Sequence, residues 1–600
     1  MVRTRARRRL VALVVPALVL LAGCTAGTGP SPAVTTPTGA PPSPSRTSGP
    51  LPIRAVAPAE PAVVVDVTDP VQAALAASRA LYAAAPVAVL AAADDTAGQL
   101  TAASAAVALG APLLLTPPAA AASGGVTEPG LAAELTRLRT VAVLVVGPAP
   151  APRGVVVVRL PGGAGGAALT RATGAAFGST APVAPGDEAA AVGRLARPRP
   201  TVLAASATAV VVGAVAAGDP GPGRTQPVLA SPVLAAAEPL VPTLPRTSPP
   251  AAVAATVALT GAGTVPPAVL ATVRAAGLPL VDAPGADPRA TSSAVQALAR
   301  ATPAHVLALG AAFGPGDRLA ERVATATTGV ELPGGGQLYF PQDEALPGKR
   351  YVSIYGSPGT PALGVLGEQD VPATIARAQA HAEPYRALTA DTVVPGVEII
   401  ATIASAGPGT DGNYSQERPV ADLLPLVQAA GAAGMSVVLD LQPGRTDFLT
   451  QAQEYQPLLE LPYVSLALDP EWRLGPTQVH LKQIGHVDVD EVNAVSAWLA
   501  QLVRDHHLPQ KALVLHEFAL SMIAGRDRLD TSHDELAVVI HVDGQGSQPA
   551  KVGTWNAIRQ GAPAGVHWGW KNFYDEDKPA MLDPVGTYAI QPTPDLVTYQ

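Results

Sequence analysis

The stretch Val437-Val438-Leu439-Asp440-Leu441-Gln442-Pro443-Gly444 is an apolar run that ends in an acid, an amide and a turn. Apolar runs that end in acids, amides, His or Trp return later in the chain, in residues 466–472, 513–518, 538–544 and 566–572. Short apolar runs bounded by turn residues are typical of buried parallel strands. Each of these predicted strands therefore ends in polar side chains at the point where it leaves the core.

Strands of this kind recur throughout residues 339–600, at 351–355, 397–404, 436–441, 464–468, 512–515, 536–542 and 566–570. Helical patterns lie between them, at 371–388, 420–433, 492–503 and 550–560. This alternation predicts an α/β fold with a C-terminal (β/α)8 barrel, and residues 587–590 are the best candidate for its eighth strand. In barrel enzymes the carboxyl ends of the strands build the active site, so the polar strand ends are the candidate functional residues.

These candidates fall into two groups. The predicted catalytic residues are the acids Asp469, Glu471, Glu517 and Asp543. The predicted substrate-binding residues are Tyr355, Asp440, Gln442, His541, Trp568, Trp570 and Lys571. Side chains alternate across a strand, so residues two apart point the same way and several of these can face one mouth. Carboxylates beside aromatic rings suit a sugar, because the rings stack on its apolar face and the acids act on the glycosidic bond.

The region resembles a TIM-barrel glycoside hydrolase in architecture and residue type, without matching a family signature. The resemblance implies two carboxylates in one cleft, about 5–5.5 Å apart for retention or about 6.5–9.5 Å apart for inversion. We expect Asp469 or Glu471 to pair with Glu517, and Glu517→Gln to abolish turnover. Structural alternatives remain for several residues: Asp440 bonds its own turn, Glu517 pairs with Arg526, the two tryptophans pack in the core, or His516, Glu517, His541 and Asp543 bind a metal.

Residues 61–335 are predicted to form a separate module, because all Trp and Lys residues lie beyond residue 340. Three similar apolar strands recur in this region, at 87–91, 201–205 and 305–309, after helical patterns. They indicate repeated parallel, Rossmann-like α/β units. No Gly-rich phosphate-binding motif follows them, so neither a nucleotide nor another cofactor is predicted.

Residues 89–95 and 105–116, followed by a strand at 141–147, resemble the cell wall-binding repeat type 2. Residues 285–291 resemble the Gly-Asp-Arg-Tyr-x-Thr signature of this family, with Pro288 in place of the aromatic residue. The resemblance implies a three-lobed module that docks on anionic wall polymers. The alternative is a spacer that has the fold without the ligand.

The N-terminus has the three parts of an export signal, namely a basic start, an apolar run at residues 10–21 and small residues before Cys24. Leu21-Ala22-Gly23-Cys24 resembles the bacterial lipobox, which implies that residues 1–23 are removed and that Cys24 is acylated. The alternative is an ordinary secretory signal. Residues 24–60 are rich in Pro, Thr and Ser and are predicted to be a disordered tether.

Composition agrees with a location outside the cytoplasm. Cys24 is the only cysteine, and the net charge of −8 argues against nucleic acid as a partner. We therefore expect an envelope lipoprotein, anchored by its lipid to the outer face of the membrane, whose barrel acts on an envelope or extracellular glycan. The alternative is a non-enzymatic surface lipoprotein that binds wall polymer or serves as a scaffold.

Overall fold

The computed structural model describes residues 49–118, 129–206, 243–261, 263–341 and 346–600. The predicted signal peptide, Cys24 and most of the predicted tether lie outside the described residues. Within the tether range, β1 (Leu51–Pro52) pairs with β11 (Thr247–Ser248), and β2 (Arg54–Ala55) pairs with β4 (Tyr82–Ala84). These residues are ordered ahead of the predicted boundary at residue 60, because Ile53 between the two strands is buried and anchors them.

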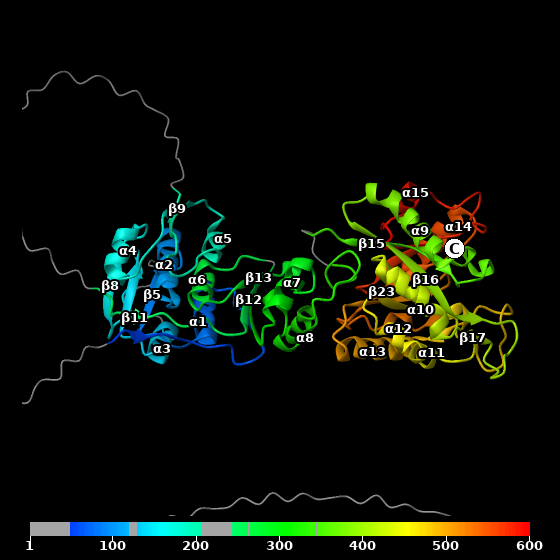
Figure 1. Cartoon of the computed structure of the whole chain (residues 1–600), viewed down its shortest axis with the longest axis horizontal. Helices are drawn as coiled ribbons and strands as arrows, with labels where there is room; N and C mark the ends of the chain where they lie inside the picture. The colour runs from blue at the N-terminus through cyan, green and yellow to red at the C-terminus, as the bar shows by residue number, and fades with distance from the viewer. Residues whose placement is uncertain (1–48, 119–128, 207–242, 262, 342–345) are drawn as a thin grey trace, which may run out of the picture. The chain divides into compact units, whose positions relative to one another are not determined.

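The described part of the N-terminal region is built on parallel sheets flanked by helices (Figure 1). One sheet has the order β6 (Leu113–Thr116), β5 (Val87–Ala92), β7 (Ala142–Val146), β8 (Val156–Leu160). A second has the order β13 (Leu280–Asp282), β12 (Thr256–Thr260), β14 (His305–Leu309), β3 (Ala62–Val65). A smaller one pairs β9 (Thr180–Val183) with β10 (Val202–Ala205). The three recurring strands of the sequence pattern correspond to β5, β10 and β14, which confirms the predicted α/β class.

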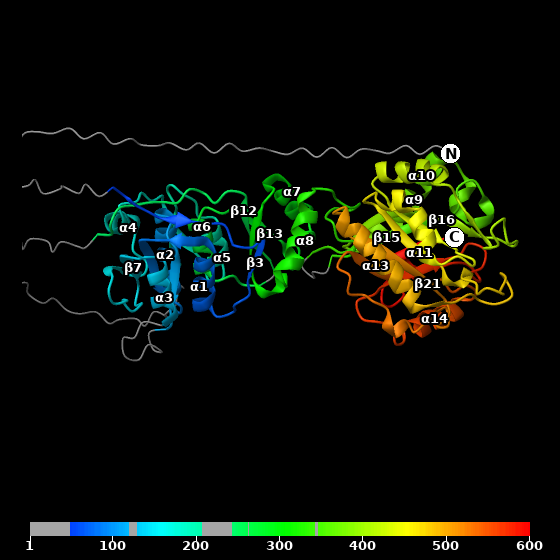
Figure 2. The same cartoon turned by 90° about the horizontal axis from the view of Figure 1, so that it is seen from below.

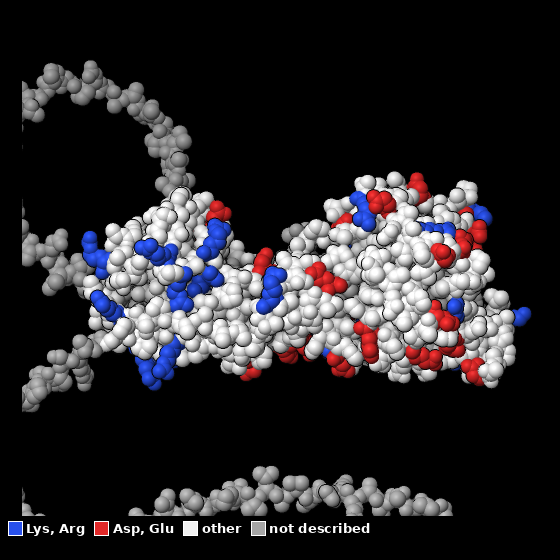
Figure 3. All heavy atoms as spheres, viewed as in Figure 1, with Lys and Arg blue, Asp and Glu red and all other residues white. Residues whose placement is uncertain are grey.

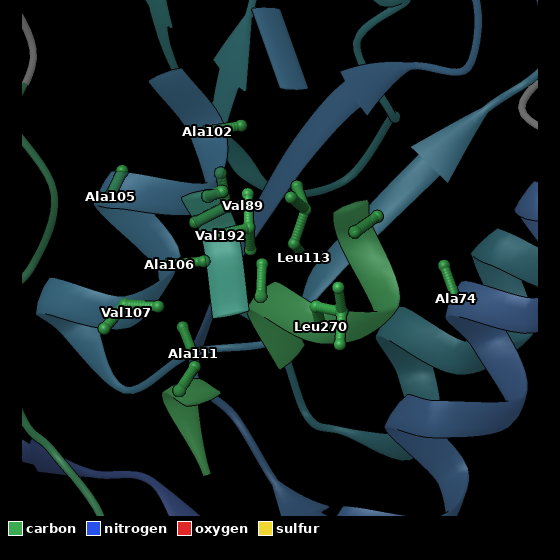
Figure 4. Packing of buried hydrophobic residues seen from close by; sticks show 14 of the residues in the cluster. Ala74, Val89, Ala102, Ala105, Ala106, Val107, Ala111, Leu113, Val192 and Leu270 are labelled. Carbon is green, nitrogen blue, oxygen red and sulfur yellow. The ribbon is translucent and has the colours of Figure 1, made fainter. Parts of the chain in front are cut away.

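Helices connect these strands: α1 (Pro70–Leu81), α2 (Thr96–Leu109), α3 (Pro129–Arg137), α4 (Gly166–Thr173), α5 (Glu188–Gly193), α6 (Pro267–Ala275), α7 (Ser292–Ala301) and α8 (Gly316–Thr327). Every residue of α2 from Gly98 to Leu109 is buried, as expected for a helix that is apolar all round. Its alanines let α2 lie close to both a sheet and α6, and Figure 4 shows Ala102, Ala105 and Ala106 in the same cluster as Leu113 and Leu270.

The C-terminal region is a closed barrel of eight parallel strands, as predicted. In chain order they are β15 (Lys349–Gly356), β16 (Thr392–Ala404), β18 (Ser436–Leu441), β19 (Val464–Leu468), β21 (Lys511–Glu517), β23 (Leu536–Val542), β24 (His567–Asn572) and β25 (Leu596–Tyr599). The barrel closes because β15 pairs with both β16 and β25. A short antiparallel strand, β17 (Ser415–Glu417), extends from β16.

The predicted position of the eighth strand is wrong. Residues 584–588 form a short helix, α15 (Pro584–Tyr588), whose first turn is capped by Asp583, and the eighth strand is β25 at the end of the chain. Four residues are too few for a clear sequence pattern. They form a strand because β15 and β24 offer backbone hydrogen bonds on both sides.

The outer layer of the barrel includes α9 (Val371–Ala382), α10 (Val420–Ala432), α11 (Phe448–Glu454), α12 (Gln456–Leu459), α13 (Val489–Asp505) and α14 (Gln548–Arg559) (Figure 2). The first of these ends earlier than the predicted residue 388. Pro384 has no backbone N–H, and the chain continues there as a 3-10 helix, Glu383–Ala387.

An aromatic plug closes the amino-terminal end of the barrel. Tyr339 stacks on Tyr351 with ring centroids 4.1 Å apart, and Phe340 meets Tyr351 edge to face at 5.5 Å. These rings pack with inward residues of several strands, including Val394 and Val438. The charged side chains that line the barrel interior lie at the opposite, carboxyl end, whereas the buried Ser436 and Ser465 lie near the plug.

Arg289, from the segment that resembles the repeat signature, lies in an ion-pair network. Its guanidinium is 2.8 Å from a carboxylate oxygen of Asp287 and 2.8 Å from one of Asp534, which precedes β23. Arg322 of α8 also pairs with Asp534, at 2.6 Å. In this chain Arg289 thus connects the last α/β unit to the barrel region. Among the described residues, no helix is long and apolar enough to cross a membrane.

Candidate active site at the carboxyl end of the barrel

The polar strand ends divide into an inward and an outward set. Register places Tyr355 beside Glu398, His516 beside His541, and Lys571 beside Thr598. Neighbours in register on parallel strands lie on the same face of the sheet. A hydrogen bond of 3.0 Å between the His541 Nε2 and the Thr598 hydroxyl shows that this face is the interior. A polar layer therefore lies above the apolar layer at the bottom of the barrel.

His516 is the centre of this layer. Its Nε2 lies 2.7 Å from Oε1 of Glu398, and its Nδ1 lies 3.2 Å from Oδ2 of Asp543. All three side chains are buried. Burial alone lowers the pKa of a histidine, but Glu398 and Asp543 outweigh burial here and raise the pKa of His516 well above its usual value. Each ring nitrogen of His516 thus faces a carboxylate, an arrangement that favours the protonated ring, which can donate to both.

Tyr355 contacts Asp440, and Lys571 contacts Tyr355. The Tyr355 hydroxyl donates to Oδ2 of Asp440 at 2.7 Å, and the Gln442 amide donates to the Tyr355 oxygen at 3.3 Å. Burial raises the pKa of Asp440 to about 6, with His516 opposing this shift and Glu398 adding to it. The Lys571 ammonium lies 3.7 Å from the centroid of the Tyr355 ring, a cation–π contact inside an acidic cluster.

Asp469 and Glu471 follow β19 at the mouth, on either side of Pro470. Asp469 is buried and Glu471 is half-buried. Burial, Glu471 and Asp440 raise the pKa of Asp469 well above its usual value. Burial and the neighbouring Asp543 raise the pKa of Glu471 to about 7, while Lys571 opposes the shift. Glu471 is thus a partly accessible carboxyl that holds its proton close to neutral pH, as a general acid must.

His541 is fully buried in the same layer. Burial and the neighbouring cations His516 and Lys571 lower its pKa well below the usual value, so His541 is neutral. Gly569 on the next strand makes room for this ring, because a Cβ there would lie 2.3 Å from the His541 Cδ2. His541 is therefore a packing residue of the interior polar layer and does not lie at the mouth of the barrel.

Glu517 points the other way from His516 and does not join Asp469 and Glu471 at one mouth. Its Oε2 accepts a hydrogen bond of 2.6 Å from Arg526, whose guanidinium also donates to the carbonyl of Ile558 at 2.7 Å. Both side chains are buried. Glu517 therefore pairs with Arg526, which is the structural alternative stated from the sequence. The pair lies between the barrel wall and its helices.

The two tryptophans of β24 also lie on the outer side of the barrel wall. Trp570 is buried and meets Trp555 of α14 edge to face at 5.6 Å, and its Nε1 donates to Asn572 at 2.9 Å. Trp568 meets Trp555 at 5.9 Å. These contacts correspond to the core-packing alternative and place no sugar platform at the mouth.

Two residues of the site were not singled out from the sequence. Glu398 is the one acid of β16 and contacts His516; a charged residue within a long apolar strand was the signal. Trp472 directly follows Glu471, is half-buried, and meets His480 edge to face at 5.3 Å. Trp472 thus supplies the aromatic ring beside the acids that Trp568 and Trp570 do not.

The C-terminal region is thus a closed (β/α)8 barrel with carboxyls, a buried histidine and a lysine at its carboxyl end. No family model matches the chain, and no curated protein matches it. The structure is similar to that of Cwp6 from Clostridium difficile, with 12% sequence identity and a TM-score of 0.30. The match covers 64% of this chain and 62% of Cwp6, less than two thirds of that protein. A similarity of this size carries no inference about function, and the resemblance to cell wall-binding repeats stays a prediction.

Proposed function

We propose that the barrel is a glycoside hydrolase in which Glu471 is the general acid and Asp543 is the second carboxylate. The observation that carries the proposal is the position of Glu471, a half-buried carboxyl with a pKa of about 7 at the mouth of the barrel. The test is the release of new reducing ends when the purified chain is incubated with bacterial wall polysaccharides. The absence of release from every such glycan would contradict it.

The surroundings of Glu471 and Asp543 suit their proposed roles as general acid and second carboxylate. Glu471 protonates the glycosidic oxygen as the bond to the leaving group breaks. Asp543 is oriented by the hydrogen bond from His516 and stabilises the positive charge that develops at the anomeric carbon. Burial and the neighbouring carboxyl of Glu471 raise the pKa of the buried Asp469 well above its usual value, so Asp469 holds its proton beside the proposed acid.

Trp472 is the proposed sugar platform. It is the half-buried aromatic residue next in sequence to the proposed acid, and its ring is held by His480, whose Nε2 lies 2.9 Å from the carbonyl of Tyr414. An aromatic face stacks on the apolar face of a pyranose ring. Trp472→Ala should therefore raise KM more than it lowers kcat.

A non-enzymatic role in binding wall polymer is the second candidate. The face seen in Figure 3 carries basic side chains over the N-terminal sheets and acidic ones over the barrel. A basic face favours an anionic polymer as ligand. Under both proposals, hydrolase and polymer binder, we place the chain outside the cytoplasm, held to the membrane through a lipid on Cys24.

The pH dependence of turnover should report Glu471. A general acid must be protonated, and burial beside Asp543 raises the pKa of Glu471 to about 7, so kcat/KM should fall as pH rises through about 7. Initial rates measured from pH 5 to pH 9 check this. A rate that stays constant across neutral pH would assign the acid to another residue.

Acylation of Cys24 has its own test. Mass spectrometry of the protein from the membrane fraction should show a mature chain that begins at an acylated Cys24. Cys24→Ser should move the protein to the soluble exported fraction, because the acyl chains supply the anchor. A mature N-terminus elsewhere would contradict the lipobox assignment.

A further inference from the structure

Some carboxylate oxygens of the interior polar layer have no hydrogen-bond partner. Among the described residues, Oε2 of Glu398 and Oδ1 of Asp440 are buried oxygens without a hydrogen-bond partner. Both side chains are fully buried. An unpartnered carboxylate oxygen in such a place costs free energy unless a cation or a proton satisfies it.

These two residues converge with His516. Glu398, Asp440 and His516 each offer one ligand atom, and the three atoms all lie within 4.8 Å of one another. The residues come from β16, β18 and β21, three strands of the closed barrel. A rigid wall therefore holds one imidazole nitrogen and two carboxylates around a common point.

The neighbours of these groups have the arrangement found around metal ligands. Asp543 accepts from the Nδ1 of His516, which leaves Nε2 directed at Glu398. Tyr355 donates to Oδ2 of Asp440, which leaves Oδ1 of the same carboxylate unpartnered. Carboxylates that orient a ligating histidine, and donors that bind the second oxygen of a ligating carboxylate, are typical of such sites.

We propose that Glu398, Asp440 and His516 bind a divalent transition-metal ion, for which zinc is the best match. Imidazole suits zinc better than magnesium or calcium, and carboxylates complete a mixed nitrogen and oxygen set. Ligand atoms around tetrahedral zinc are about 3.3 Å apart, so the distance of 2.7 Å between Oε1 of Glu398 and Nε2 of His516 opens by about 0.6 Å when the ion binds. The ion replaces the Nε2 proton of His516, which passes to solvent. None of the proposed hydrolase residues Glu471, Asp543 and Trp472 is a ligand, and the two proposals meet only where Asp543 contacts the Nδ1 of His516.

The first test uses the purified full chain after dialysis against a chelator. Titration with zinc chloride should show one saturable site per chain and a rise in the temperature of barrel unfolding. Glu398→Gln and Asp440→Asn should each weaken zinc binding more than about 100-fold, since each removes a ligand. Asp469→Asn is the matched control: it neutralises a buried acid of the same cluster that lies outside the ligand set and should bind zinc like the wild type.

The second test needs no variant, so a failure to fold cannot obscure it. Crystals of the wild-type chain grown with zinc should show an anomalous difference peak between Glu398, Asp440 and His516. A peak elsewhere, no saturable binding of zinc or manganese, or equal binding by Asp440→Asn would overturn the proposal. Glu471→Gln should bind zinc normally, so failure of the hydrolase proposal and failure of the metal site give different results.

Discussion

Glu471→Gln should lower kcat by about 10³-fold, within the range that positioned general acids contribute. Glutamine has the same shape but no proton to give to the leaving oxygen. KM should change little, because the substrate still meets Trp472 and the rest of the mouth. Turnover on a wall glycan that the wild type cleaves is the measurement, and a glycan with a good leaving group should recover part of the lost rate, since it needs less help from an acid.

Three further variants serve as comparisons for Glu471→Gln. Asp543→Asn should lower kcat by a similar factor, because it removes the charge opposite the acid. Glu383→Gln makes the same chemical change in an exposed ion pair with Arg386 and should leave turnover unchanged. Glu517→Gln should retain turnover in its folded fraction, because Glu517 faces the helices; this replaces the expectation from sequence. Full activity of Glu471→Gln would reject Glu471 as the acid.

Arg526→Met should destabilise the barrel by about 3–5 kcal/mol, the range for breaking a buried ion pair from one side. The change leaves the Glu517 carboxylate buried beside the barrel wall without its partner at 2.6 Å. Denaturant unfolding followed by tryptophan fluorescence is suitable, because Trp555, Trp568 and Trp570 pack in this layer.

The double variant Arg526→Met/Glu517→Gln separates the pair from the packing around it. Removing both charges should recover a large part of the loss, since no buried charge is left. Glu517→Gln alone should cost less than Arg526→Met, because Arg526 still donates to the carbonyls of Ile558 and Gln560. If the two single variants cost the same and the double variant costs their sum, the side chains are not coupled.

The strand positions of the barrel could be read from the sequence because each strand is a compact apolar run with a polar end. Residues 436–441, 464–468 and 536–542 are strands with the predicted bounds. The acids Asp469, Glu471 and Asp543 could be found in the same way, since each follows such a run. The alternation of side chains does not extend to Glu471, because Pro470–Trp472 is a 3-10 helix. Local sequence decided these features because they depend on burial and alternation within one strand.

The direction of each strand's side chains came only from the tertiary structure. In β21 and β24 the residues on both faces are buried, because one face lines the barrel interior and the other contacts helices. When both faces of a strand are buried, its sequence does not alternate between apolar and polar residues. The sequence therefore does not show whether His516 or Glu517 points inward. Closure of the barrel decides it, and closure also brings Glu398 to His516 across 118 positions. The sequence by itself determined which residues end the strands, and the tertiary structure decided which of them share a site, because only a closed sheet has an inside.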